Sequence, residues 1–362
     1  MRTGLSNRSA ARARVKALWA GLLRISGLLF LAKRWVRRHG VIVLTFHRVL
    51  RDAELEQTAS LPGMLVREQT FGDFLKYAAE KCELVDISRE PDWRPGSKMK
   101  LAITFDDGWF DNAAIADPIA CRHRVPIAIF IVSDTMGATL PFWPERAVSA
   151  LSGSQEIGYV EQTIENLKGL PAAERDQRVR QLVAEHATPQ SHPSVDRTMT
   201  WEQAGELDCH GVVFGSHTST HEILTTIPLK QAEEEIAGSR ERIEQKLGKP
   251  CQLFSYPNGN CSEKVRKLVQ RTGYKFAFLN QDPGVWTRDC DPFLVPRVNV
   301  CEYHLIDAKG RFSPLIFDYS VVWKAAKGWI RQMWRKNLSK GESQVRSYAH
   351  QQTTKEHERY PS

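Results

Sequence analysis

Two adjacent acids, Asp106 and Asp107, end the apolar run at residues 101–105 (LAITF), and Gly108 follows them. Burying two carboxylates is costly unless they meet solvent or a cation. Because neighbouring strand residues point to opposite faces, both acids can face one pocket only if the strand has ended, and glycine permits the sharp turn. The pair therefore indicates either two acids that face one functional pocket or, as the alternative, a solvent-exposed turn that caps a helix.

A pair of histidines, His217 and His221, follows a second apolar run at residues 212–216 (VVFGS). Side chains four residues apart share one face of a helix, and two imidazoles at that spacing can bind one ion. With Asp106 or Asp107 as third ligand, a position stays open for water on Zn²⁺ or a similar divalent ion. The alternative is a pair of surface histidines.

A third apolar run passes into a proline–glycine turn at residues 254–260 (FSYPNGN). Such a turn can direct a backbone N–H into a pocket. Taken alone, a plain β-turn explains it equally well.

The apolar runs that precede these motifs belong to a longer alternation of strand and helix patterns. Strands are expected at residues 41–46, 83–87, 101–105, 126–132, 212–215, 252–255, 274–278 and 294–300. Helices are expected at residues 71–81, 112–123, 229–247 and 262–272, and a helical insertion at about 144–200. This alternation predicts an α/β fold with a parallel sheet, open or closed as a barrel, and sites at the carboxyl ends of its strands.

Positive charge is concentrated at the two ends of the chain. Residues 1–40 hold ten Arg or Lys and no acid, and residues 321–362 carry a net charge of +6. The chain as a whole carries +8, so residues 41–320 carry −8. An acidic body argues against a nucleic-acid groove, whereas the basic ends indicate contact with an anionic surface.

The apolar stretch at residues 17–32 is interrupted by Arg24 and is shorter than the roughly 20 residues that span a bilayer. We therefore favour a helix lying in the membrane interface, with a signal or anchor, or a helix packed on the protein, as alternatives. Residues 321–338 are expected to form a basic, Trp-rich amphipathic helix, at a membrane or docked on the domain, and residues 339–362 a disordered tail. Seven cysteines without a C-x-x-C pair indicate free thiols and a reducing compartment.

Together and in this order, the motifs resemble the polysaccharide deacetylases with a NodB homology domain, carbohydrate esterases that remove N-acetyl groups from amino sugars. The family motif T-F-D-D-G is matched at residues 104–108, H-[ST]-x-x-H at 217–221, and a Tyr-Pro-x-Gly turn at 256–259. TFHRV at residues 45–49 and VPRVNV at 295–300 are similar to elements of the branch that includes poly-N-acetylglucosamine deacetylases.

This resemblance implies a distorted (β/α) barrel of fewer than eight repeats and a metal-dependent amide hydrolase. Asp107, His217 and His221 would hold one divalent ion, Zn²⁺ with Co²⁺ or Ni²⁺ as alternatives. Asp106 would be the general base for the water that attacks the acetamide carbonyl. The backbone N–H of Tyr256 would help to stabilise the oxyanion.

The remaining roles follow from the same resemblance. The family's usual late histidine motif is absent and only His304 stands nearby, so His47 is assigned as the acid that protonates the leaving amine; the alternative is a histidine capping a strand. Arg297 would hydrogen-bond a site carboxylate or, alternatively, form a surface ion pair. Pro257 would line the substrate-binding site with Tyr256. Apart from the resemblance, Trp143 at the start of the insertion would stack on a sugar ring or, as we favour, anchor the insertion.

The expected domain spans residues 41–320, and the expected substrate is an N-acetylated saccharide of a cell-envelope polysaccharide or exopolysaccharide. A deacylase of a lipid-linked sugar precursor and a non-catalytic saccharide-binding protein are the alternatives. We expect association with a bacterial inner membrane through an anionic surface, on the cytoplasmic rather than the periplasmic side. No nucleic-acid partner is indicated, and the oligomeric state is left open.

Overall fold

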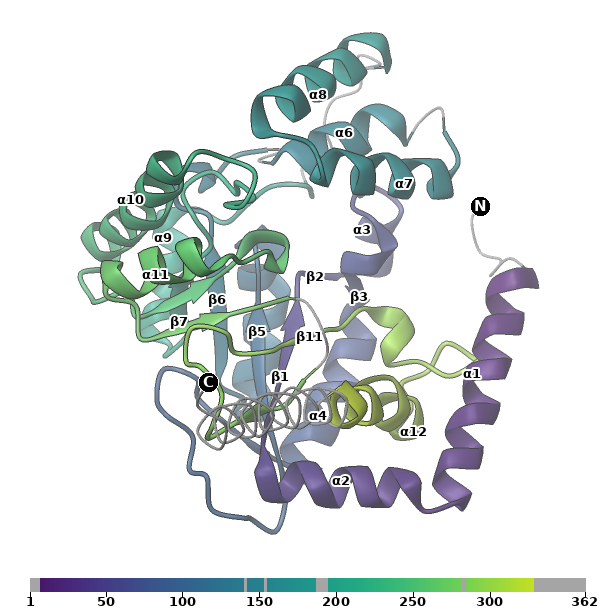
Figure 1. Cartoon of the computed structure of the whole chain (residues 1–362). Helices are drawn as coiled ribbons and strands as arrows, with labels where there is room; N and C mark the ends of the chain where they lie inside the picture. Colours follow the sequence, from purple (N-terminus) through teal and green to yellow (C-terminus); the bar gives the residue numbers. More distant parts are fainter. Residues whose placement is uncertain (1–6, 140–141, 153–154, 187–194, 281–283, 329–362) are drawn as a thin grey trace, which may run out of the picture.

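A curled, mostly parallel β-sheet forms the centre of the protein in a computed structural model, which describes residues 7–139, 142–152, 155–186, 195–280 and 284–328 (Figure 1). The strands follow the order β10-β1-β5-β6-β7-β8-β9, with β4 beside β5 and β11 beside β1. Their bounds are β1 Gly40–Phe46, β4 Cys82–Leu84, β5 Met99–Phe105, β6 Ile127–Ile131, β7 Val213–Ser216, β8 Leu253–Ser255, β9 Phe276–Phe278, β10 Trp286–Thr287 and β11 Val298–Asn299. A separate parallel pair joins β2 (Arg48–Leu50) to β3 (Leu65–Arg67).

The central strands are buried on both faces, as expected for parallel strands in an α/β protein. Every residue of β1 and β5 is buried. The segment at residues 295–300 links the two sides of the curled sheet: the Val295 N–H donates to the Ala277 carbonyl of β9, and the Val300 N–H donates to the Thr45 carbonyl of β1. The predicted distorted barrel of fewer than eight repeats is therefore confirmed.

Two predicted strands are shorter than the sequence suggested. The strand expected at 294–300 is reduced to β11, and Pro296, which has no N–H to donate to a ladder, precedes it. The strand expected at 83–87 ends at Leu84, where the chain enters a turn in which the Asp86 carboxylate accepts from the Ser88 N–H.

The helices predicted at residues 71–81, 112–123, 229–247 and 262–272 are present, whereas those at Trp201–Cys209 and Pro314–Phe317 were not predicted. Their bounds are α4 Glu68–Lys81, η2 Asn112–Ala116, α5 Asp117–His123, α9 Trp201–Cys209, α10 Leu229–Leu247, α11 Glu263–Thr272, α12 Pro314–Phe317 and η6 Asp318–Trp323; short elements α3 (Asp52–Leu55), η1 (Pro62–Met64), η3 (Ser133–Thr135), η4 (Pro257–Gly259) and η5 (Glu302–His304) lie in the loops. Phenylalanines fill the space between α4 and the sheet; the rings of Phe46 and Phe71 are 5.3 Å apart between centroids.

The inserted segment forms three helices, α6 (Trp143–Leu151), α7 (Ile157–Lys168) and α8 (Ala172–His186), over the carboxyl ends of the strands (Figure 1). Each helix of the insertion contributes to a second apolar cluster, which includes Leu151, Ile164 and Leu182 and to which Ile223 of the barrel is added. This second cluster explains how a largely polar stretch folds as a helical unit above the barrel.

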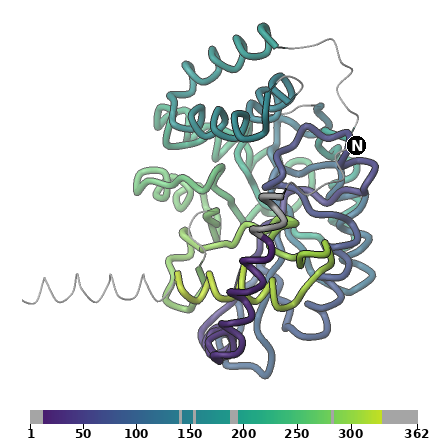
Figure 2. Tube along the Cα trace, turned by 90° about the vertical axis from the view of Figure 1, so that its right-hand side faces the viewer, coloured from purple at the N-terminus to yellow at the C-terminus, as the bar shows by residue number. Residues whose placement is uncertain are grey.

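The N-terminal segment forms two helices, α1 (Asn7–Ile25) and α2 (Leu28–His39), which Gly27, at a φ of 77°, separates by a bend of 75°. No single helix in the described ranges is long and apolar enough to cross a membrane, although the bent pair meets the criterion when taken together. Figures 1 and 2 show α1 beside α12 and η6. Of the expected C-terminal helix, residues 321–328 are described; its remainder and the tail at 339–362 lie outside the described residues.

Candidate active site

Asp107, His217 and His221 converge at the carboxyl end of the sheet. Asp107 Oδ1 lies 3.5 Å from His217 Nε2 and 3.4 Å from His221 Nε2. One ligand atom from each residue lies within 4.8 Å of the others. Two nitrogens and one carboxylate oxygen, all facing a common point, are a donor set that fits a catalytic Zn²⁺-type centre with an open position.

Sharp backbone turns bring the three ligands together. Asp107 and Gly108 have φ values of 74° and 69°, so the chain turns immediately after β5, as the sequence predicted. His221 has a φ of 66°, which is uncommon for a residue with a side chain. Such strained positions gather at sites that the surrounding structure holds in place.

The expectation that the two histidines share a helical face was wrong, although their rings do meet, with centroids 5.0 Å apart. Residues 217–221 form an irregular loop after β7. The Glu235 carboxylate of α10 accepts hydrogen bonds of 2.9 Å from the N–H groups of Ser219 and Thr220. These N–H groups are satisfied by a distant side chain, which holds the loop without helical hydrogen bonds.

Hydrogen bonds to the far sides of the candidate ligands orient the atoms that face one another. His217 Nδ1 lies 2.8 Å from the Ser255 carbonyl, to which it can only donate, so Nε2 keeps its lone pair. Burial lowers the pKa of His217 to about 4, which keeps the ring neutral at pH 7. The Trp109 indole N–H donates to Asp107 Oδ2 at 3.1 Å and leaves Oδ1 to face the imidazoles. Outer contacts of this kind are typical of metal ligands.

Asp106 is held by Arg297 in a buried two-pronged ion pair, with Nη1–Oδ1 and Nη2–Oδ2 distances of 2.8 and 2.6 Å. Both side chains are about 1% exposed. Burial disfavours the charged carboxylate, but the Arg297 guanidinium, together with nearby His217 and His47, outweighs burial and lowers the pKa of Asp106. Of the two interpretations of Arg297, the structure shows the hydrogen bond to a site carboxylate.

His47 follows β1 and lies close enough to the two acids for its charge to lower the pKa of both Asp106 and Asp107. Its carbonyl accepts from the Asn112 side-chain amide at 2.8 Å. Its Nδ1 is buried and has no hydrogen-bond partner among the described residues. His304, in contrast, lies among Lys16 and Lys324, away from the site acids.

The substrate contacts expected of the Tyr256–Pro257 turn need correction, whereas Trp143 takes one of its two expected roles. The backbone N–H of Tyr256 donates to the Phe278 carbonyl at 3.1 Å and is therefore not free for an oxyanion. The Tyr256 ring is fully buried and its hydroxyl donates to the Phe293 carbonyl, and Pro257 is buried beside it. Trp143 is 4% exposed in the core of the insertion, under the Arg175 guanidinium, which favours anchoring over stacking on a sugar.

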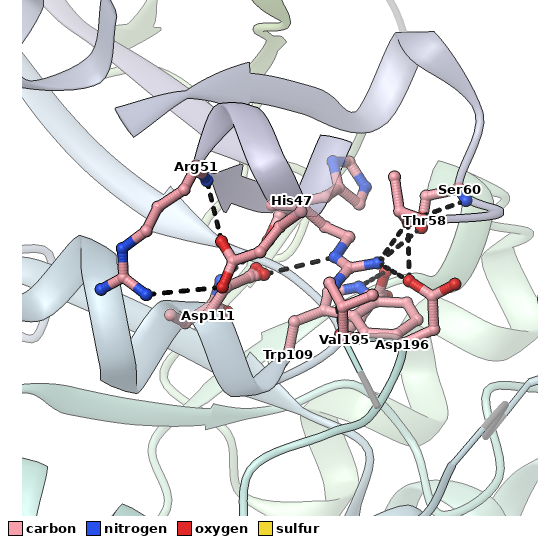
Figure 3. A network of polar contacts seen from close by, with 12 residues as sticks. His47, Arg51, Thr58, Ser60, Trp109, Asp111, Val195 and Asp196 are labelled. Atoms are coloured by element: carbon pink, nitrogen blue, oxygen red, sulfur yellow. Dashed lines mark hydrogen bonds and ion pairs between the residues drawn. The ribbon is translucent and has the colours of Figure 1, made fainter. Parts of the chain in front are cut away.

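Sequence reasoning missed a buried network around Arg48, which follows His47 (Figure 3). The Arg48 guanidinium contacts the Asp111 carboxylate at 3.2 Å and the Asp196 carboxylate, and it lies 4.3 Å from the centre of the Trp109 ring. Its guanidinium also donates to Thr58, Ser60 and the Val195 carbonyl.

The Arg48 network connects the end of the insertion to a candidate metal ligand, because the Trp109 indole that Arg48 contacts donates a hydrogen bond to Asp107. Arg48 lies within the TFHRV motif, but no sequence pattern indicates which residues it contacts.

The insertion also contributes Phe142 and Glu145 to the site. The Phe142 ring lies 4.8 Å from the His221 ring between centroids. Glu145 is 6% exposed, and burial followed by the charge of Asp107 raises its pKa to about 7. No feature of the sequence distinguishes Glu145 from the exposed acids of the insertion.

Comparison with known proteins identifies the family. The family described as "Polysaccharide deacetylase" matches residues 94–277, about half of the chain, and the chain therefore belongs to that family. YxkH of Bacillus subtilis (strain 168), which is named for the same family, is 23% identical over 209 residues. These are 58% of this chain and 54% of YxkH, so the match spans about half the length of that relative.

Solved structures share the fold. The Streptococcus pyogenes deacetylase PplD in complex with acetate is 15% identical, with a TM-score of 0.50 over 76% of this chain and 99% of that chain. IcaB from Ammonifex degensii is 16% identical, with a TM-score of 0.50 over 79% and 98% of the two chains. BC0361, a polysaccharide deacetylase from Bacillus cereus, is 18% identical, with a TM-score of 0.51 over 75% and 67%.

Proposed function

We propose that this protein is a metal-dependent deacetylase that removes acetyl groups from the N-acetylated sugars of a cell-envelope polysaccharide or exopolysaccharide. The observation that carries the proposal is the Asp107–His217–His221 cluster beside an arginine-held carboxylate, Asp106, at one end of the barrel. Membership of the polysaccharide deacetylase family supports the same reaction.

The cluster supplies the electrophilic side of the reaction. A divalent cation held by Asp107, His217 and His221, which we propose to be Zn²⁺, would polarise the amide carbonyl and lower the pKa of a water molecule. The chemistry left to the protein is proton transfer and orientation of the sugar amide.

The two proton-transfer roles fall to Asp106 and His47. Asp106, ionised beside Arg297, accepts the proton of the attacking water as the oxygen–carbon bond forms. When the carbon–nitrogen bond breaks, protonated His47 gives a proton to the leaving amine, and acetate is the second product. The buried, unpartnered Nδ1 of His47 supports this role, since no described residue occupies that atom.

The His47→Ala variant is expected to lower the rate of deacetylation by about 10²-fold or more, because the amine then leaves without its acid. Metal content, measured by elemental analysis, is expected to stay at the wild-type level. The matched control is His210→Ala, since that histidine is exposed and outside the site. Wild-type activity in His47→Ala would remove His47 from the mechanism.

Acetate release from a panel of N-acetylated oligosaccharides, with and without chelator, tests the proposed function. We expect release that a chelator abolishes and that added Zn²⁺, Co²⁺ or Ni²⁺ restores. Acyl release from lipid-linked sugars alone would favour the lipid-linked alternative. If protein that is shown to carry the ion binds saccharides but releases no acyl group, the proposed enzymatic activity is rejected in favour of a saccharide-binding protein.

A further inference from the structure

A cavity of about 380 Å³ separates α1 from η6 and the turn at η5, and it shares no residue with the candidate active site. Lys16 and Trp19 line it from α1, and Ser320 and Lys324 line it from the C-terminal side, with Tyr303 between them. Figure 2 shows that α1 lies beside the C-terminal elements α12 and η6.

The cavity carries positive charge, and no acid stands among the described residues that line it. Lys16 is only 5% exposed, and its ammonium group donates to the Tyr303 carbonyl and lies 3.5 Å from the centre of the Tyr303 ring. Burial lowers the pKa of Lys16 to about 8, so the group is still mostly protonated at pH 7. Lys324 is the charged side chain that opposes its protonation, and no described carboxylate acts on it. Two cations without an acid favour an anionic ligand.

An unpartnered hydroxyl lines the same cavity. Ser320 is 1% exposed, and its Oγ is buried with no hydrogen-bond partner among the described residues. A buried hydroxyl that makes no hydrogen bond costs free energy, which a ligand oxygen would recover by accepting from it. The hydroxyl is thus a second feature, independent of the lysines, that suits an oxyanion.

An apolar row borders the cavity on the outer face of α1. Val15, Leu18, Trp19 and Leu22 are spaced for one helical face, and they are 55, 63, 54 and 48% exposed. Beyond the bend, Phe30 and Leu31 of α2 are 66 and 56% exposed. On the opposite side of the helix pair, Ala32 and Val36 of α2 are packed into the core of the barrel, and Ala20 of α1 is buried. Soluble surfaces rarely expose so continuous an apolar row.

We propose that this cavity binds the phosphate of an anionic membrane lipid, with the lipid chains lying along the exposed row of α1. Ammonium and hydroxyl groups are the donors that a phosphate oxygen accepts, and Trp19 lies between them and the apolar face, as tryptophans do at a bilayer surface. Residues 1–40 contain no acid that would repel such a surface. The cavity refines the predicted membrane contact from a general charge effect to a specific site.

Flotation of the purified full chain with phosphatidylcholine vesicles, with and without phosphatidylglycerol, tests this proposal. Two lysines near a membrane together account for about 25-fold in partitioning, so Lys16→Gln/Lys324→Gln is expected to lose roughly that much binding to the anionic vesicles. The charge-matched control Lys230→Gln/Lys267→Gln, at exposed lysines elsewhere, is expected to change binding less than about twofold. Equal losses in the two double variants would overturn the site.

Two further measurements distinguish a lipid site from a diffuse charge effect and from a site for small soluble phosphates. Ser320→Ala changes no charge and is expected to weaken binding to anionic vesicles several-fold, with the thermal unfolding temperature confirming an intact fold. Soluble glycerol phosphate is expected to compete only weakly, because it lacks the chains that contact α1. Binding of glycerol phosphate as strong as that of the vesicles would overturn the lipid assignment. None of these measurements depends on turnover, so they stand apart from the proposed deacetylation.

Discussion

Asp106→Asn is expected to lower the rate of acetate release by about 10²–10⁴-fold, because the amide cannot accept the proton of the attacking water. The metal content of the variant is expected to equal that of the wild type, since Asp107, and not Asp106, faces the imidazoles of His217 and His221. Elemental analysis and single-turnover rates on the same preparation measure both quantities.

The matched control for Asp106→Asn is Asp107→Asn, which is expected to lose the ion as well as the activity. If Asp106→Asn loses the ion and Asp107→Asn keeps it, the roles of the two acids are exchanged. Because Arg297 keeps its charge while its partner loses one, the unfolding temperature of Asp106→Asn is measured alongside.

Arg297→Gln is expected to move the acid limb of the pH–rate profile to higher pH. In the wild type, Arg297 and the nearby histidines together outweigh the effect of burial and hold the pKa of Asp106 below its ordinary value, so the carboxylate stays ionised as the pH falls toward that value. Without the guanidinium, burial dominates and raises the pKa of Asp106. The carboxylate then becomes protonated, and inactive as a base, at a pH where the wild type still works. Profiles of kcat/KM against pH measure the shift.

Arg297→Lys is the control for this prediction, because it keeps a positive charge but loses the two-pronged contact. Its acid limb is expected to lie between those of the wild type and Arg297→Gln. Loss of one partner of a buried pair costs about 3–5 kcal/mol of folding stability, so the profiles are recorded below the unfolding temperature of each variant. A lower rate with an unmoved acid limb would show that Arg297 does not tune Asp106.

The sequence predicted the sheet because strands and turns depend on local patterns, whereas the convergence of the acids and histidines followed from the resemblance to a known family. An apolar run followed by Asp106, Asp107 and Gly108 specifies a strand and a turn without reference to distant residues. The helix expected at His217 and His221 failed because Glu235, 14 positions beyond His221, satisfies the loop's N–H groups. Neither a period nor a motif shows such long-range pairing.

The dependence on long-range contacts also explains the other incorrect or missing predictions about the site. The N–H of Tyr256 was expected to face a pocket, but pairing with Phe278 of the next strand decides where it points. Arg48 and Asp196 are 148 positions apart, and nothing in either local sequence marks them as partners. The sequence did not predict the bend between the two N-terminal helices at Gly27, because leucines on both sides of that glycine form one apolar stretch.

The contact between Arg48 and Asp196 has a consequence for protein engineering. Asp196 belongs to the inserted stretch, and Arg48 also stacks on Trp109, whose indole fixes Asp107. Removing the inserted stretch would thus take one counter-charge from the buried Arg48 guanidinium and loosen the hydrogen-bonded surroundings of Asp107, a candidate metal ligand. The insertion is therefore not an independent module. Transferring it to a related protein requires that Arg48 and Asp196 be transferred together.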